Sequence, residues 1–298
     1  MTSHERLRAD RIFNAAPPEL FFIMSAIAQY TGAIIAVRLF RDISPATVAW
    51  LRVLSASIIL LAFSARTSHS RWSRRELYWV AAFGTSTALM NLFFYLAIDR
   101  LPLGKGVTIE FIGPITVAAL RTRSVRNTVA LVCAAVGVVV LGGVELGSEP
   151  LGLVFILAAS VMWANYIVMG SRVALADRGV SGLALGLLFG GIVITPFAVG
   201  DAGVAFSSGK ILIGCALVGL LSNAIGYGID QSTLRRIPIR RFSVMLALLP
   251  VCAAIFGFAF LHQSPSLVDL LGMTFVLTGV AIQERDETER HHEVVETT

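Results

Sequence analysis

Residues 127–144 read NTVALVCAAVGVVVLGGV, and within them residues 130–141 are apolar without interruption. As an α-helix rising about 1.5 Å per residue, the stretch is about 27 Å long and matches the apolar core of a lipid bilayer. A strand of a membrane barrel would instead alternate apolar and polar residues. The stretch therefore predicts a membrane-spanning helix and excludes a barrel.

Further apolar windows of similar length lie along the whole chain. With the first they predict ten transmembrane helices, at 20–37, 46–65, 77–98, 102–121, 127–144, 151–171, 181–201, 211–229, 242–262 and 266–283. Of 298 residues, 56% are hydrophobic and 14% charged, against about 25% charged in soluble domains. The composition excludes a soluble protein and predicts an all-α integral membrane protein that works within the lipid bilayer.

Basic residues divide unequally between the two sides of these helices. Of the 24 Lys and Arg residues, 18 lie in the two terminal tails or in connections on the same side of the membrane as the tails. Four lie on the opposite side, and Arg52 and Lys105 fall inside helices. Short connections rich in basic residues stay in the cytoplasm, so residues 1–19 and the tail at 284–298, which we expect to be disordered, are predicted to be cytoplasmic. The pI of about 9.5 then reflects topology and predicts no nucleic-acid partner.

One motif, Asn-x3-Tyr followed by two prolines twelve residues apart, occurs twice. Its members are Asn91, Tyr95, Pro102 and Pro114 in the first copy and Asn223, Tyr227, Pro238 and Pro250 in the second. The copies lie about half a chain apart, which predicts two five-helix repeats at 20–145 and 151–283. Because five is odd, the second repeat would be inverted, an arrangement typical of secondary transporters. Chance agreement of a few residues is the alternative.

The prolines of the motif are candidate helix breaks. A proline inside a helix cannot donate to the carbonyl four residues earlier, so Pro114 would free the carbonyl of Glu110 and Pro250 that of Leu246. Freed carbonyls at membrane depth are tolerated where they face protein or a water-filled cavity. The fourth and ninth helices are thus predicted to be cavity walls, with simple kinks filled by neighbours as the alternative.

Two charged residues are predicted to lie deep in the membrane. By helix rise, Glu110 and Arg52 lie about 13 and 10 Å from the outer ends of their helices. Such residues usually mark proton or substrate pathways, so Glu110 is a candidate proton carrier and both are candidate substrate ligands that could also pair. The alternative is a purely structural ion pair. Lys105, one turn inside its helix, is expected to snorkel to the surface.

Polar and aromatic residues add to this candidate site. The predicted substrate-binding residues are Arg52, Asn91, Tyr95, Glu110, Asn223, Tyr227, Trp163 and Tyr166. Each Asn and Tyr of a motif share one helix face, although hydrogen bonds between helices and packing explain such residues equally well. The glycines of Gly182-x3-Gly186-x3-Gly190 predict close packing within the bundle, with a homodimer as the alternative.

No catalytic motif is present: the sequence lacks HExxH, a Walker A loop and GxSxG. The three cysteines stand singly in apolar stretches, so no disulfide, metal site or cofactor is predicted. The competing classes are an intramembrane enzyme, which the missing motifs disfavour, and a passive channel, which the paired helix breaks disfavour.

The stretch 90–98 (MNLFFYLAI), followed by LPLG at 101–104 and IEFIGP at 109–114, resembles the EamA family of the drug/metabolite transporter superfamily. Trp163-Ala164-x-Tyr166-Ile167 and the segment from Pro238 to Leu249-Pro250 resemble the second half of that family. The resemblance covers residues 20–283. His262-Gln263 stand where many members carry Gly-Glu, and Lys105 stands where a small or apolar residue is usual.

The resemblance implies ten helices in two inverted repeats around a central cavity, in the bacterial inner membrane. It also implies export of small neutral amino acids such as threonine and homoserine, driven by proton antiport. Within the family, export of another small metabolite or an amphipathic drug is the alternative.

The topology is directly testable. Because 18 of the 24 basic residues lie on the side of the tails, a fluorescent protein fused to the C-terminus should fluoresce in bacterial cells. Alkaline phosphatase fused at the same point should be inactive, and an active phosphatase would contradict the ten-helix topology.

Overall fold

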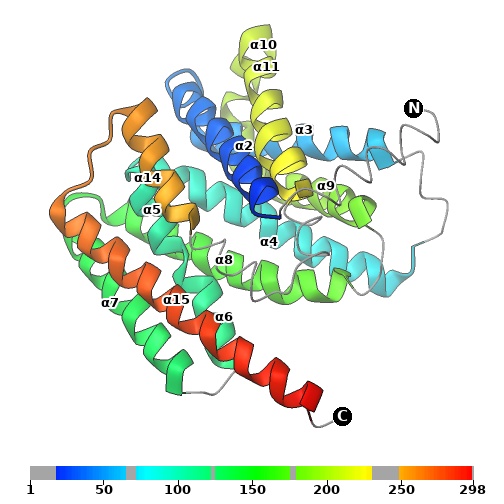
Figure 1. Ribbon diagram of the computed structural model, residues 1–298. Coiled ribbons are helices and arrows are strands. Elements are labelled where there is room, and N and C mark those ends of the chain that lie inside the picture. The colour runs from blue at the N-terminus through cyan, green and yellow to red at the C-terminus, as the bar shows by residue number, and fades with distance from the viewer. Residues whose placement is uncertain (1–17, 65–71, 122–124, 175–178, 230–247, 297–298) are drawn as a thin grey trace.

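A computed structural model describes residues 18–64, 72–121, 125–174, 179–229 and 248–296, and every regular element in these ranges is a helix (Figure 1). The first half contains α2 (Pro18–Leu39), α3 (Pro45–Ser64), α4 (Arg74–Ile98), α5 (Leu103–Glu110), α6 (Ile112–Arg121) and α7 (Val125–Ser148). The second half contains α8 (Pro150–Ala174), α9 (Gly179–Ala198), the 3-10 helix η1 (Val199–Asp201), α10 (Ala202–Ser207), α11 (Gly209–Val218), the π-helix η2 (Gly219–Gly226), α14 (Leu248–Leu261) and α15 (Leu267–Glu296).

Proline and capping residues mark several helix starts. α3 and α8 begin at Pro45 and Pro150, positions where the missing N–H of proline forfeits no helical hydrogen bond. Before α4, the Ser73 hydroxyl accepts from the Glu76 N–H at 3.2 Å, and the Glu76 carboxylate accepts from the Ser73 N–H at 2.7 Å. This reciprocal pair satisfies donors that the first helical turn leaves free.

Five helical segments are long and apolar enough to cross a membrane: Pro45–Ser64, Arg74–Ile98, Pro150–Gly170, Val180–Ser207 and Gly209–Ile229. Shorter apolar helices cover Ile23–Leu39, Val125–Leu141, Leu249–Leu261 and Leu267–Ile282. The predicted helix at 102–121 is divided into α5 and α6, of 8 and 10 residues. The all-helical architecture of the described chain agrees with the sequence, while the count of ten spans stays a prediction.

The outside of the bundle is rich in large apolar side chains. Phe63, Phe197 and Leu267 are 73%, 68% and 85% exposed. Water would leave such side chains unfavourably solvated, whereas lipid tails are as apolar as they are. The surface therefore suits a lipid environment.

Helices of the two halves pack on one another in matched pairs. α3 packs on α9, α5 on α14 and α7 on α15, and Figure 1 shows α7 and α15 side by side. The third helix of each half packs on the first of the other, as α4 does on α8 and α11 with η2 does on α2. A two-fold relation between the halves would produce this exchange.

Glycines bring α4 and α9 into backbone contact. A Cβ atom at Gly84 would overlap the carbonyl oxygen of Gly186, and one at Gly190 would overlap that of Gly84. Two of the three glycines in the predicted stripe therefore pack within the bundle, whereas a homodimer stays a prediction.

Candidate functional site

The site begins at an interruption in a helix. α5 ends at Glu110, Phe111 adopts a turn, and Pro114 is the third residue of α6. The Phe111 N–H donates to the Thr108 carbonyl at 3.3 Å, a bond of the tighter 3-10 type, and the Ile115 N–H donates to the Phe111 carbonyl at 3.3 Å. Because Pro114 has no N–H, the backbone around Glu110 departs from the regular helix.

The other prolines of the repeated motif have different positions. Pro102 stands immediately before the first residue of α5, and its side chain forms no capping hydrogen bond. Pro250 lies in α14, two residues after the first described residue of that helix. Pro238 and Leu246 lie outside the described residues, so the predicted break in the ninth helix stays a prediction.

Glu110 is a buried acidic side chain with no direct partner among the described residues. Its side chain is 7% exposed, and no donor in the described part of the chain forms a hydrogen bond or ion pair with it. The positive charge of Arg52 acts on it through space. The direct pairing that sequence reasoning considered for these two residues is thus not formed in this conformation.

Arg52 on α3 is a buried cation, 5% exposed, held by two other elements. Its Nε donates to Oδ1 of Asn223 on η2 at 2.5 Å, and its guanidinium carbon lies 4.7 Å from the ring centroid of Tyr95 on α4. A neutral amide and an aromatic face hold the charge without neutralising it. Within the described ranges, no carboxylate lies at ion-pair distance from Arg52.

Two polar atoms beside this cation have no hydrogen-bond partner in the described part of the chain. Tyr95 and Asn223 are both fully buried, and the Tyr95 hydroxyl and the Asn223 Nδ2 are unsatisfied. A buried donor without an acceptor costs about 1–3 kcal/mol. Unsatisfied donors around one guanidinium are the arrangement that an anionic group would complete.

The two copies of the repeated motif meet at Arg52. Tyr95 belongs to the first copy and Asn223 to the second. Asn223 lies on a π-helix, a rare geometry that is frequent at functional sites. η2 can approach α3 closely here because Gly219 has no side chain. A Cβ at this position would overlap the Ser55 hydroxyl and lie 2.5 Å from the Arg52 carbonyl oxygen.

The remaining predicted residues have distinct surroundings. Asn91, 2% exposed, donates its Nδ2 to the Thr87 carbonyl at 2.8 Å, within its own helix. Trp163 packs edge-on against Phe111 with ring centroids 5.0 Å apart, at the helix interruption. Tyr166 contacts Tyr227 at 6.5 Å between ring centroids. The Trp163 ring thus lies at the interruption, and Phe111 joins the site although sequence reasoning gave it no role.

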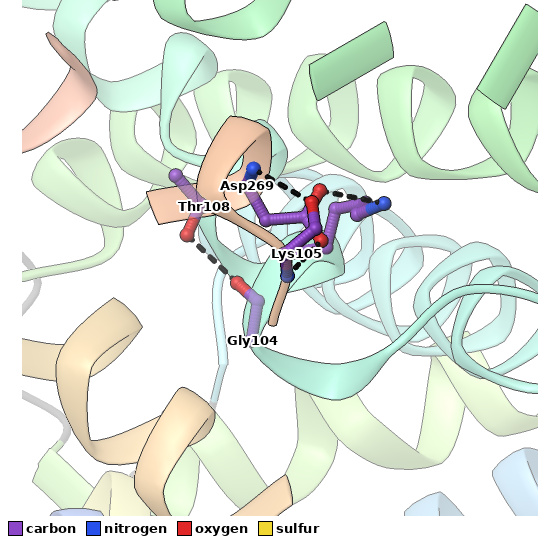
Figure 2. Close-up of polar contacts among 5 residues, drawn as sticks. Gly104, Lys105, Thr108 and Asp269 are labelled. Carbon is purple, nitrogen blue, oxygen red and sulfur yellow. Dashed lines mark hydrogen bonds and ion pairs between the residues drawn. The ribbon is translucent and has the colours of Figure 1, made fainter. Parts of the chain in front are cut away.

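A second polar cluster lies at the start of α5 (Figure 2). Lys105 Nζ and Asp269 Oδ1 of α15 form an ion pair at 2.8 Å, with side chains 6% and 10% exposed. The expectation that Lys105 snorkels to the surface is therefore wrong, because a carboxylate from the other half compensates its charge inside. Sequence analysis missed Asp269, although Ser266-x-x-Asp269 is a helix-capping pattern that could have drawn attention to it.

Comparisons with known proteins agree with this architecture. The model of the EamA-like transporter family matches residues 17–146 and 150–283. Curated relatives named Threonine/homoserine exporter RhtA, from Salmonella typhimurium and Escherichia coli K12, are 29% identical over 267 residues, covering 88% of this chain and 89% of theirs. A crystal structure 17% identical in sequence superposes with a TM-score of 0.59, covering 89% of this chain and 96% of the other, and shows the same fold. Because the family model matches most of the chain, in both halves, the protein belongs to the EamA-like transporter family.

Proposed function

We propose that this protein exports small neutral amino acids of the threonine and homoserine type across the bacterial inner membrane, in exchange for protons. The observation that carries the proposal is the buried Arg52 guanidinium. Among the described residues, the donors beside it are unsatisfied, and Glu110, on which it acts electrostatically, has no ion-pair partner. The relatives named as threonine/homoserine exporters support the same class of cargo.

The charges of the site match those of a zwitterion. The cargo carboxylate would accept from the terminal nitrogens of Arg52, the Tyr95 hydroxyl and the Asn223 amide. The cargo ammonium would donate to Glu110. Charged groups are expensive to desolvate unless each finds a partner, so an apolar drug would leave both protein charges unmatched. A sugar phosphate, with two negative charges, would meet too few cations.

The cargo hydroxyl also has a candidate partner. Asn91 uses its Nδ2 on its own helix, which leaves Oδ1 as an acceptor for a hydroxyl group. The rings of Trp163, Tyr166 and Tyr227 would form the apolar sides of the site. A wider aromatic site would instead favour an amphipathic drug or another metabolite. Transport assays with each kind of cargo distinguish these cases.

Glu110 is the residue that would couple cargo export to proton uptake. A carboxylate that binds a proton becomes neutral and no longer attracts an ammonium group. Proton and cargo would therefore compete for Glu110, so binding of one would favour release of the other. Alternating exposure of the site by two inverted halves, with both termini in the cytoplasm, would turn this competition into antiport. The matched packing of helices between the halves supports this part of the proposal.

Cargo is tested by removing the cation. Cells that overproduce the protein should tolerate more external threonine or homoserine and hold smaller intracellular pools of both. Arg52→Ala should lower export about 10- to 100-fold, because a hydrogen bond to a charged group contributes about 1.5–3 kcal/mol. Arg100→Ala is the control, because Arg100 forms only an exposed ion pair with Glu149 at 3.7 Å. Tolerance only to lipophilic cations, or normal export by Arg52→Ala, would contradict the zwitterion site.

Tyr95→Phe separates binding from folding. The change removes a buried hydroxyl that has no hydrogen-bond partner among the described residues, so stability should stay the same or rise by up to about 1 kcal/mol. If the hydroxyl binds the cargo carboxylate, the KM for export should rise several-fold. Thermal unfolding in detergent and export kinetics measure the two effects. A loss of stability with an unchanged KM would mean that the hydroxyl serves the fold.

Proton coupling is tested with Glu110→Gln in proteoliposomes. Glutamine keeps the size and hydrogen-bonding capacity of the side chain but takes up no proton. An imposed pH gradient should accelerate transport by the wild type and leave the rate of the variant unchanged. Glu149→Gln provides the same substitution at a half-exposed site and should respond like wild type. Wild-type acceleration in Glu110→Gln would show that Glu110 is structural.

A further inference from the structure

The Lys105–Asp269 ion pair joins the two halves at one face of the bundle. Lys105 lies in the first turn of α5 and Asp269 in the first turn of α15, and Figure 2 shows their side chains directed at one another. This face lies opposite the C-terminal end of α15 (Figure 1), so the proposed topology places it outside the cell. The pair is about as buried as the central site.

The local structure holds both partners in place. Asp269 accepts the Ser266 N–H at 2.9 Å through Oδ2, while the Ser266 hydroxyl accepts the Asp269 N–H at 3.2 Å. This capping arrangement leaves Oδ1 for Lys105. One carboxylate therefore caps α15 with one oxygen and binds the opposite half of the protein with the other.

A second bond joins the two halves beside the ion pair, where α5 meets α14 and α15, and we call this contact the seam. The Leu103 N–H at the start of α5 donates to the Gln263 side chain at 2.9 Å. Gln263 is positioned because the chain turns at His262, whose φ is 55°, and the Gln263 N–H donates to the Gly257 carbonyl at 3.1 Å. Gln263, which stands where many family members carry glutamate, thus caps α5 with an uncharged side chain.

The seam is tight as well as bonded. A Cβ on Gly104 would lie 2.7 Å from the Cα of Ala254, so α5 and α14 touch through their backbones. Between Lys105, Gln263, Asp269 and Met273 remains a cavity of about 20 Å³. That is room for about one water molecule and too little for an amino acid. In this conformation the seam is closed to cargo.

We infer that Lys105 and Asp269 form the outer gate of the transporter, which holds α5 against α15 until the halves separate. The inference rests on the proposed function, because a gate is needed only where access alternates. A buried ion pair is compensated while the seam is closed, and water admitted by opening solvates both charges separately. The pair therefore allows two alternative states, whereas an apolar seam would expose apolar surface to water on opening.

The test measures how fast a cysteine behind the gate reacts from outside. Met273→Cys places a thiol at the cavity, in a background whose Cys133, Cys215 and Cys252 are alanines. Right-side-out spheroplasts are treated with a membrane-impermeant methanethiosulfonate reagent. Lys105→Met with Asp269→Asn removes both charges and leaves no unpaired buried ion, and the asparagine oxygen can still cap α15.

Removing the gate should accelerate labelling at least about tenfold, because a minor open state usually holds about 0.1–10% of molecules. Lys105→Arg, which keeps the charge, and Arg100→Ala, which opens only an exposed ion pair on the same face, should label at the parent rate. Lys105→Met alone should lower the melting temperature, because it leaves the buried Asp269 carboxylate without its ion-pair partner.

Equal labelling rates with and without the pair would overturn the gate and make the pair a static clamp. The cargo proposal fails by a different result, the absence of threonine or homoserine export by the wild type. Faster labelling of the double variant would support the gate even then.

Discussion

The Arg52 guanidinium lies inside a bundle whose outer surface is apolar, and groups from other helices must compensate its charge. An isolated buried charge costs several kcal/mol, and an aromatic face with a neutral amide offsets only part of this. The requirement determines much of the surrounding structure. η2 must approach α3 closely enough for Asn223 to reach Nε, and α4 must place Tyr95 against the guanidinium. Glu110, at the helix interruption, lies within electrostatic reach of the guanidinium.

The repeated motif has different roles in its two copies. In the first, Asn91 bonds to its own helix and Tyr95 supports the cation. In the second, Asn223 supports the cation and Tyr227 packs against an aromatic neighbour. One arginine, which has no counterpart in the motif, thus breaks the equivalence of two similar halves. An asymmetric ligand with unlike ends fits such a site better than a symmetric one.

Much of the fold could be predicted from sequence because helix length and apolarity are local properties. The interruption beside Glu110 was predictable for the same reason, since the missing N–H of Pro114 acts within one helical turn. Pairings were harder. Helix rise gave similar depths for Arg52 and Glu110 but not the direction of each side chain. Asn223 was a predicted site residue, yet its hydrogen bond to Arg52 was not foreseen. Lys105 was misjudged because its partner, Asp269, lies near the other end of the chain.

The backbone contact between α4 and α9 has a mechanical consequence. At Gly84, Gly186 and Gly190 the two backbones approach one another directly, and the side chains of Phe83 and Ala88 on α4 pack against the glycines of α9. A similar seam joins α7 and α15, where a Cβ at Gly137 would lie 2.6 Å from the Gly272 carbonyl oxygen. Backbones that lie this close gain many van der Waals contacts, and any gap between the helices forfeits them. At both seams the fit between the halves leaves no room for even one methyl group, so a side chain at any of these glycines would wedge the two halves apart.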